Sequence, residues 1–252
     1  AMKSSQKFLP LLSLAILLIG CDGLKKGPVD ISITFAPVFD GTEVIYEQSQ
    51  HQSATTNDAF TFVRSDLILT DFSLLDENGE VANEIGGSAA YVHMAGDLSD
   101  RNWTLTDQID PGHYGGIRFY IGPDTSANHG DPSLWPAGHP LNPTVNGLHW
   151  GWAGGYIFSA LEGTYATSTG TNPFLYHIGF DSNRVRVDIL QDIDFRRDRN
   201  VTVDFDLANI FDGTHLIEPA ITGDFTHSTF DNGLASKVRD NLMGAFSIKD
   251  IY

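Results

Sequence analysis

Alternating apolar and polar residues dominate the chain after its first 28 residues. Every second residue of 29–35 is apolar, and the same alternation returns at 185–189 and 201–207. Successive side chains of a β-strand point to opposite faces, so this pattern predicts half-buried antiparallel strands. Further strands are expected where short apolar runs lie between turn residues, at 60–63, 66–75, 90–94, 116–121, 155–161 and 174–179.

Turn and helix signals complete the expected fold. An Asn78-Gly79 pair lies between two apolar runs and predicts a hairpin turn. Helical periodicity is clear only near the end, where one apolar stripe consists of Leu234, Val238, Leu242 and Phe246. The sequence therefore predicts an all-β protein, a single antiparallel β-sandwich over residues 29–252 whose one C-terminal helix closes the fold.

The stretch 122–154 does not fit a strand. It contains five prolines, which a central strand does not accept, and it is unusually long for a loop inside one domain. Its aromatic residues Trp135, Trp150 and Trp152 argue for order, because large buried rings fix the backbone around them. We expect this Trp/Pro/Gly-rich loop to cover one end of the sandwich and to carry His129, His139 and His149 with it.

The first 28 residues are typical of an export signal followed by a tether. Lys3 and Lys7 precede an apolar run at 8–20 that is too short to span a bilayer comfortably, so residues 1–20 are predicted to be a signal peptide. The sequence LIGC that ends at Cys21 resembles the lipobox of bacterial lipoproteins, in which the Cys is lipidated. A plain secretory signal is the alternative. The expectation is a lipoprotein in the periplasm or at the cell surface, anchored in the outer membrane through Cys21, with 21–28 as tether.

Charge and cysteine content narrow the possible partners. The chain has 15 Lys plus Arg against 32 Asp plus Glu, a formal net charge of −17, which argues against nucleic acid as a partner. Cys21 is its one cysteine. If Cys21 carries lipid, the exported body has no thiol for a disulfide, a zinc cluster or nucleophilic catalysis. Any metal site must then use His, Met, carboxylate or aromatic side chains.

The order of several segments resembles a known family. From residue 29 to 250 the chain resembles the MbnP-like copper-binding proteins, which include copper-repressible surface proteins of methane oxidisers. The segments that carry the resemblance are LTDFSLLDENGEV, AAYVHMAGD, PGHYGGIRFYIGPD, GLHWGWAGGYIFSALEG and FLYHIGFD. The most specific of them is GLHWGWAGGYIFSALEG, with its W-x-W, its Gly-Tyr pair and its terminal L-E-G.

The resemblance implies a copper ion held by two histidines on neighbouring strands. In some members kynurenine completes the site, made from a Trp by a diheme peroxidase-like partner of the MauG class. By this resemblance His93 of AYVHM and His177 of FLYHIG are the ligand pair. The oxidised Trp of those members lies two residues before the first histidine, where this chain has Tyr91, so the resemblance does not extend to kynurenine at that position.

The chemistry of the residues is consistent with copper. Imidazole nitrogen suits copper, and the Irving–Williams order makes Cu(II) the tightest divalent ion at nitrogen ligands. Tyr91 and His93 are two apart, so on a strand they share a face and Met94 points away. Tyr91 is then a weak phenol ligand or a hydrogen-bond partner of the site. Trp150 and Trp152 also share a face; they are expected to control water access, and either is a candidate for oxidation.

Simpler readings of the same residues remain open. Any histidine can be a surface or hydrogen-bonded core residue, His139 can bond its own loop, and the two tryptophans can be core anchors. Acidic residues on the late strands allow a calcium site, although no EF-hand spacing occurs and a solvated face explains them as well. These residues are Asp188, Asp192, Asp194, Asp204 and Asp206.

The expected function is binding rather than catalysis. No G-x-S-x-G, H-E-x-x-H, phosphate-loop or dinucleotide motif occurs in the exported chain, although carboxylates such as Asp124 and Glu162 are available. The leading hypothesis is an exported lipoprotein that binds copper for acquisition, storage or transfer. The alternative is a carbohydrate- or surface-binding sandwich whose Trp103 and Trp135 stack on sugars. The distance between the two proposed copper-binding imidazoles discriminates between them.

Overall fold

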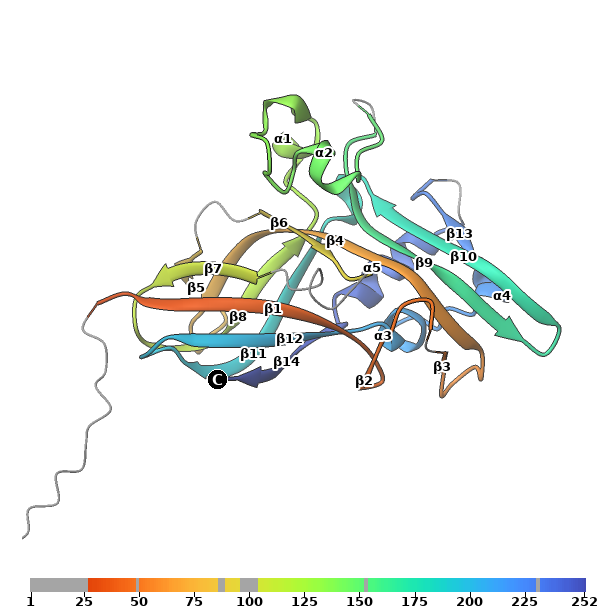
Figure 1. Cartoon of the computed structure of the whole chain (residues 1–252), viewed down its shortest axis with the longest axis horizontal. Coiled ribbons are helices and arrows are strands. Elements are labelled where there is room, and N and C mark those ends of the chain that lie inside the picture. Colours follow the sequence, from red (N-terminus) through yellow and green to blue (C-terminus); the bar gives the residue numbers. More distant parts are fainter. Residues whose placement is uncertain (1–26, 49, 86–88, 96–103, 152–153, 230–231) are drawn as a thin grey trace, which may run out of the picture.

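Figure 1 shows a computed structural model of the chain. It describes residues 27–48, 50–85, 89–95, 104–151, 154–229 and 232–252, with the backbone alone at 104–106. The predicted signal peptide, Cys21, Trp103 and Trp152 lie outside these residues.

Two β-sheets make up the body of the protein. The smaller sheet has the order β14-β12-β1-β2, with β7 also paired to β1, and the larger sheet has the order β11-β8-β4-β9-β10-β13, with β3, β5 and β6 paired to β4. The strands of the smaller sheet are β1 (Val29–Phe39), β2 (Thr42–Glu43), β7 (Thr104–Ile109), β12 (Arg199–Asp206) and β14 (Phe246–Ile251). Those of the larger sheet are β3 (His51–Gln52), β4 (Ala59–Leu75), β5 (Val81–Glu84), β6 (Ala89–His93), β8 (His113–Ile121), β9 (Ile157–Thr167), β10 (Gly170–Gly179), β11 (Val185–Asp194) and β13 (Phe225–Thr226).

Aromatic rings join the two sheets. Phe35 of β1 lies edge-on to Phe119 of β8, with ring centroids 5.6 Å apart, and Phe119 packs in the same way on Phe246 of β14 at 5.2 Å. One cluster of buried apolar residues includes side chains from both sheets. The predicted β-sandwich is therefore confirmed, and its core consists of the apolar positions of the alternating strands.

The prediction of a purely antiparallel sandwich is wrong, because the sheets are mixed. β1 pairs with β12 in parallel from Ile31 opposite Arg199 to Val38 opposite Asp206, and β10 pairs with β13 in parallel. Alternation of apolar and polar residues is the same for either strand direction, so the pattern could not decide this point.

β4 is the central strand of the larger sheet and begins the predicted hairpin. The expected runs 60–63 and 66–75 form this one strand, with a register shift between Phe62 and Arg64 opposite β9. In the turn into β5, Gly79 has φ 80°, and the backbone carbonyl of Glu80 accepts a hydrogen bond from the backbone N–H of Asp76 at 2.8 Å. The hairpin at Asn78-Gly79 is therefore confirmed.

The predicted C-terminal helix is present as α5 (Leu234–Leu242), which buries Leu234, Val238 and Leu242. It does not close the fold. Phe246, placed on the helical stripe by the sequence, starts β14 and stacks on Phe205 of β12 at 4.8 Å. The described residues also form four α-helices of four or five residues, too short to show periodicity in the sequence: α1 (Thr125–Asn128), α2 (Pro143–Asn146), α3 (Ala208–Asp212) and α4 (Pro219–Thr222). Among the described residues, no helix has the length and apolarity needed to cross a membrane.

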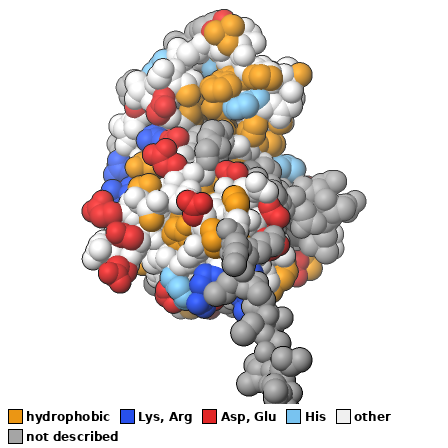
Figure 2. All heavy atoms as spheres, turned by 90° about the vertical axis from the view of Figure 1, so that its left-hand side faces the viewer, with side chains coloured by type: hydrophobic (Ala, Val, Ile, Leu, Met, Phe, Trp, Pro, Cys, Tyr) orange, Lys and Arg blue, Asp and Glu red, His pale blue; other side chains and the backbone are white. Residues whose placement is uncertain are grey.

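The long loop contains α1, α2 and a 3₁₀ turn, and lies at the upper end of the molecule in Figure 1. The side chain of Asn128 accepts a hydrogen bond from the backbone N–H of Tyr156 at 2.8 Å and donates one to Asp181 at 2.7 Å. These bonds join the loop to the residue before β9 and to the 3₁₀ turn that follows β10. Figure 2 shows hydrophobic side chains gathered at this upper end and acidic side chains spread over the face below it.

Candidate metal centre

The predicted ligands His93 and His177 lie in one row across the larger sheet. Asp66 of β4 is opposite His93 of β6 on one edge and opposite Ala160 of β9 on the other. His177 of β10 is in turn opposite Ala160. Directly paired residues project from the same face of a sheet, so both imidazoles face the same side, with two strands between them.

A buried carboxylate holds His93 and Tyr91. Asp66 is 1% exposed, and its Oδ1 lies 2.6 Å from His93 Nδ1. Its Oδ2 accepts hydrogen bonds from the Tyr91 hydroxyl at 3.1 Å and from Arg64 Nε at 2.5 Å. Burial, with the negative charge of Asp66, raises the pKa of Tyr91, so the phenol stays neutral and donates. In this arrangement Tyr91 is a hydrogen-bond partner of the carboxylate.

A second carboxylate holds His177 in the same way. Glu162 Oε1 lies 2.9 Å from His177 Nε2 and accepts a hydrogen bond from Arg64 Nη1 at 3.1 Å. Burial alone would raise the pKa of Glu162, but the hydrogen bond to His177 and the charge of Arg64 together lower it below its usual value. Burial lowers the pKa of His177, although Glu162 acts in the opposite direction. The pair is therefore a neutral imidazole beside an ionised carboxylate.

The other ring nitrogen of His177 is Nδ1. It is buried and makes no hydrogen bond within the described part of the chain. The ring of His227 adjoins the ring of His177, with centroids 4.9 Å apart and planes at 73°. His227 follows β13 directly, and β13 comes alongside β10 by parallel pairing. Two imidazoles thus meet at this edge of the sheet.

Ser228 and Trp150 enclose the His177–His227 pair. The Ser228 hydroxyl donates to the carbonyl of His177 and accepts the N–H of Gly179, both at 2.9 Å. Ser228 has φ 65°, a conformation that L-residues adopt at a cost, so the two bonds hold a backbone that would otherwise relax. The Trp150 ring lies 5.8 Å from that of His227.

A glycine makes room for the indole. A Cβ added to Gly179 would lie 2.6 Å from Cζ3 of Trp150 and 2.7 Å from the carbonyl oxygen of Tyr156. Gly179 therefore permits a close approach of Trp150 to the end of β10, next to the two imidazoles. Control of water access by Trp150, expected from the sequence, stays a prediction.

Two strands lie between His93 and His177, and three strand spacings put their Cα atoms about 14 Å apart. Copper–nitrogen bonds near 2 Å require two ligand nitrogens within about 4 Å, so this pair stays a prediction that needs both side chains to reach toward each other across β4 and β9. Arg64 and both carboxylates also lie between them. The imidazole that adjoins His177 is that of His227. Across the described residues, no group of three or more His, Cys, Asp and Glu has a metal-binding arrangement.

Sequence reasoning missed His227 and the network that holds His177. His227 lies beyond the segments that carry the family resemblance, and a two-residue strand leaves no readable pattern before it. Arg64 and Asp66 do leave a signal, because they are residues of opposite charge two positions apart inside a long strand. Glu162 lies within the L-E-G of the most specific segment.

Two other predicted candidates, His139 and Asp188, have partners within the structure. His139 stacks on Trp135, with centroids 4.3 Å apart, and its Nδ1 accepts the N–H of Leu141. One face of Trp135 is therefore already covered by an imidazole. Asp188 binds Arg118 through both oxygens, at 2.6 and 2.8 Å, which gives this carboxylate an arginine partner in place of the calcium considered from the sequence.

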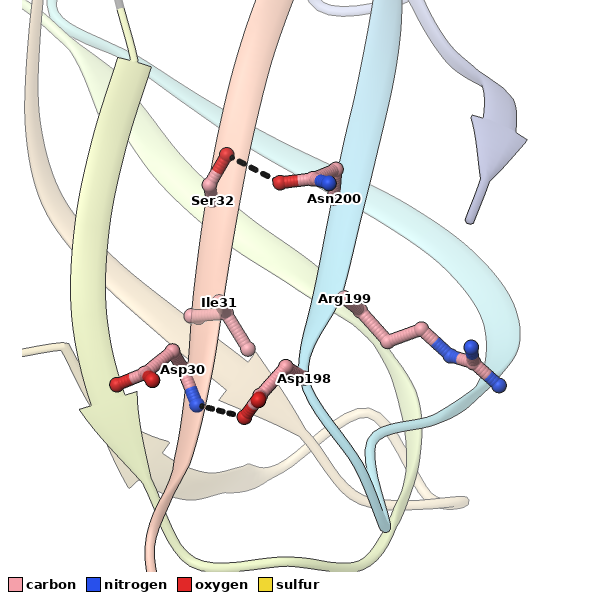
Figure 3. Close-up of a pocket in the computed structure, with 6 residues that line it drawn as sticks. All are labelled: Asp30, Ile31, Ser32, Asp198, Arg199 and Asn200. Atoms are coloured by element: carbon pink, nitrogen blue, oxygen red, sulfur yellow. Dashed lines mark hydrogen bonds between the residues drawn. The ribbon is translucent and has the colours of Figure 1, made fainter. Parts of the chain in front are cut away.

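The smaller sheet has a pocket of its own. It has a volume of about 380 Å³ and lies between the starts of β1 and β12 (Figure 3). Asp198 accepts the backbone N–H of Asp30 at 2.8 Å, and Ser32 bonds Asn200 at 3.0 Å. These polar groups satisfy one another, and the pocket is on the other sheet from the two imidazoles.

Comparison with known proteins identifies the family. The MbnP family model matches residues 28–227. The chain belongs to the MbnP family. The solved structure of MbnP from Methylosinus trichosporium is similar in fold, with a TM-score of 0.54 and 18% identity over 75% of this chain and 79% of that chain. No curated protein matches the chain. The predicted resemblance to MbnP-like proteins is confirmed.

Proposed function

We propose that this MbnP-family protein binds one copper ion through His177 and His227, for copper acquisition, storage or transfer. The observation that carries the proposal is the buried, unpartnered Nδ1 of His177 beside a second imidazole. Membership of the MbnP family suggests a copper-related role. The two-histidine site expected from the sequence is retained, with His227 in place of His93 as the second ligand.

The residues of the site fit copper. An unpaired polar atom in a buried position costs free energy, unless a ligand that the protein binds satisfies it. Imidazole is a good ligand for copper, and ring centroids 4.9 Å apart allow both nitrogens to lie about 2 Å from one ion. The carboxylate on the far nitrogen of His177 is the usual partner of a metal-binding histidine. When bound, copper would supply redox and Lewis-acid chemistry at this edge of the sheet.

A titration of four proteins tests the proposal. Cu(I) and Cu(II) are titrated in competition with a chelator into the wild type, His177→Ala, His227→Ala and His93→Ala. We expect affinity to fall by more than about tenfold in the first two variants and to be unchanged in the third. Equal copper affinity in the wild type, His177→Ala and His227→Ala would refute the site. Loss with His93→Ala but not with His227→Ala would restore the pair expected from the sequence, through a rearrangement of Arg64.

We also propose export, lipidation at Cys21 and a diheme peroxidase-like partner, as expected from the sequence. Labelling of growing cells with a fatty acid tests lipidation, and Cys21→Ser is expected to abolish the label.

The intact mass of the protein purified from its native cells, compared with that of recombinant protein, tests the partner, because oxidation of a Trp to kynurenine changes the mass. Trp150 is the first candidate for oxidation, since its ring adjoins His227.

A further inference from the structure

Glu162 touches both the proposed ligand His177 and a cation. Its Oε1 lies 2.9 Å from His177 Nε2 and accepts a hydrogen bond from Arg64 Nη1 at 3.1 Å. Arg64 is anchored in turn by Asp66, which is 1% exposed. The Glu162 side chain therefore has a fixed position, even though 27% of it is exposed to solvent.

From this contact we infer that Glu162, held by Arg64, is a positioning residue that directs copper to Nδ1 of His177. The inference rests on the proposed function and deepens it. An ionised carboxylate has no proton to donate, so the hydrogen atom in its contact with His177 belongs to Nε2. A neutral imidazole carries one ring proton, which leaves the lone pair on Nδ1.

The choice of nitrogen has a structural consequence. Nδ1 is bonded to the ring carbon that carries Cβ, whereas Nε2 lies at the far end of the ring. A metal on Nδ1 is therefore held close to the backbone of β10, where Ser228 fixes the carbonyl of His177. Donation of Nε2–H to a carboxylate also makes Nδ1 a stronger donor to the metal. Glu162 thus selects the tautomer and raises the ligand strength of the same ring.

The ring nitrogens can be observed directly. Protein labelled with ¹⁵N-histidine is studied by long-range ¹H–¹⁵N correlation spectra, without metal and with Cu(I). Without metal we expect the His177 ring to show the Nε2–H tautomer. With Cu(I) we expect the shift of Nδ1 to change and Nε2 to remain protonated.

Glu162→Gln tests the carboxylate, because an amide can either accept from Nε2–H or donate to a bare Nε2. We expect a mixture of tautomers and a loss of Cu(I) affinity of about 10- to 100-fold. Glu43→Gln on β2 of the smaller sheet is the matched control and should leave the His177 tautomer and the Cu(I) affinity unchanged. Return of the single tautomer in Glu162→Asp would add support.

The outcomes separate this inference from the proposed site. Protonation of Nδ1 in the metal-free wild type, or a Cu(I)-dependent change at Nε2, would overturn the inference while leaving copper binding by the two histidines intact. A single tautomer and unchanged affinity in Glu162→Gln would overturn the role of Glu162. The wild-type spectra decide the tautomer even if the variant fails to fold. Absence of any copper-dependent change at His177 and His227 would refute the proposed site itself, and the inference with it.

Discussion

Replacement of Arg64 by Met tests how much the buried polar network contributes to stability. The substitution removes the cation from Asp66, which is 1% exposed and whose Oδ2 accepts Arg64 Nε at 2.5 Å. Loss of one partner of a buried ion pair costs about 3–5 kcal/mol. Two features reduce that figure here: Tyr91 and His93 still hydrogen-bond the carboxylate, and the Arg64 side chain is 29% exposed. We therefore expect Arg64→Met to lower the free energy of unfolding by about 2–3 kcal/mol.

Equilibrium unfolding in guanidinium chloride measures this loss, with far-UV circular dichroism and Trp fluorescence as probes. A loss of 2–3 kcal/mol corresponds to a fall in Tm of roughly 5–10 °C for a domain of this size. Addition of Asp66→Asn to Arg64→Met should recover at least about 1 kcal/mol, because it removes the uncompensated charge. Arg186→Met is the control, since Arg186 is 58% exposed and 3.5 Å from its carboxylate. A cost of Arg64→Met no larger than that of Arg186→Met, or further destabilisation by Asp66→Asn, would refute the reasoning.

Three further changes probe the site and the sheet. Gly179→Ala adds a methyl group 2.6 Å from Trp150, so Trp fluorescence should shift in wavelength and copper affinity should fall; an unchanged spectrum would contradict the close approach. Ser228→Ala removes two hydrogen bonds and should weaken copper binding about tenfold, with a smaller effect on Tm than that of Arg64→Met; equal copper affinity would show that the loop is held by other contacts. The hydrogen bonds and charge of Arg118 hold the pKa of Asp188 below its usual value, so this pair stabilises the fold above about pH 4 and the stabilisation is lost as pH falls further. Asp188→Asn should therefore cost about 1–2 kcal/mol at pH 7 and progressively less below pH 4, and a difference that grows on acidification would contradict the assignment.

The features that could be predicted from the sequence are local ones. Alternation at 29–35, 185–189 and 201–207 indicates strands with one buried face, because the two-residue repeat of a strand acts on neighbouring residues alone. The turn at Asn78-Gly79 and the helix α5 are likewise specified by a few adjacent side chains. The family resemblance follows from segments that are each continuous in the chain.

The tertiary structure decides which strands become neighbours in the sheets and which imidazoles come into contact. Parallel pairing of β1 with β12 joins residues about 168 positions apart, and alternation is unchanged by strand direction. His93 and His177 share a face, but their separation depends on how many strands come between them. His227 reaches His177 because β13 pairs with the edge of β10 after a connection of about 45 residues. Such pairings form when burial of the whole core outweighs the entropy lost in closing long loops. This balance involves the entire chain, so it cannot be read from a short stretch of sequence.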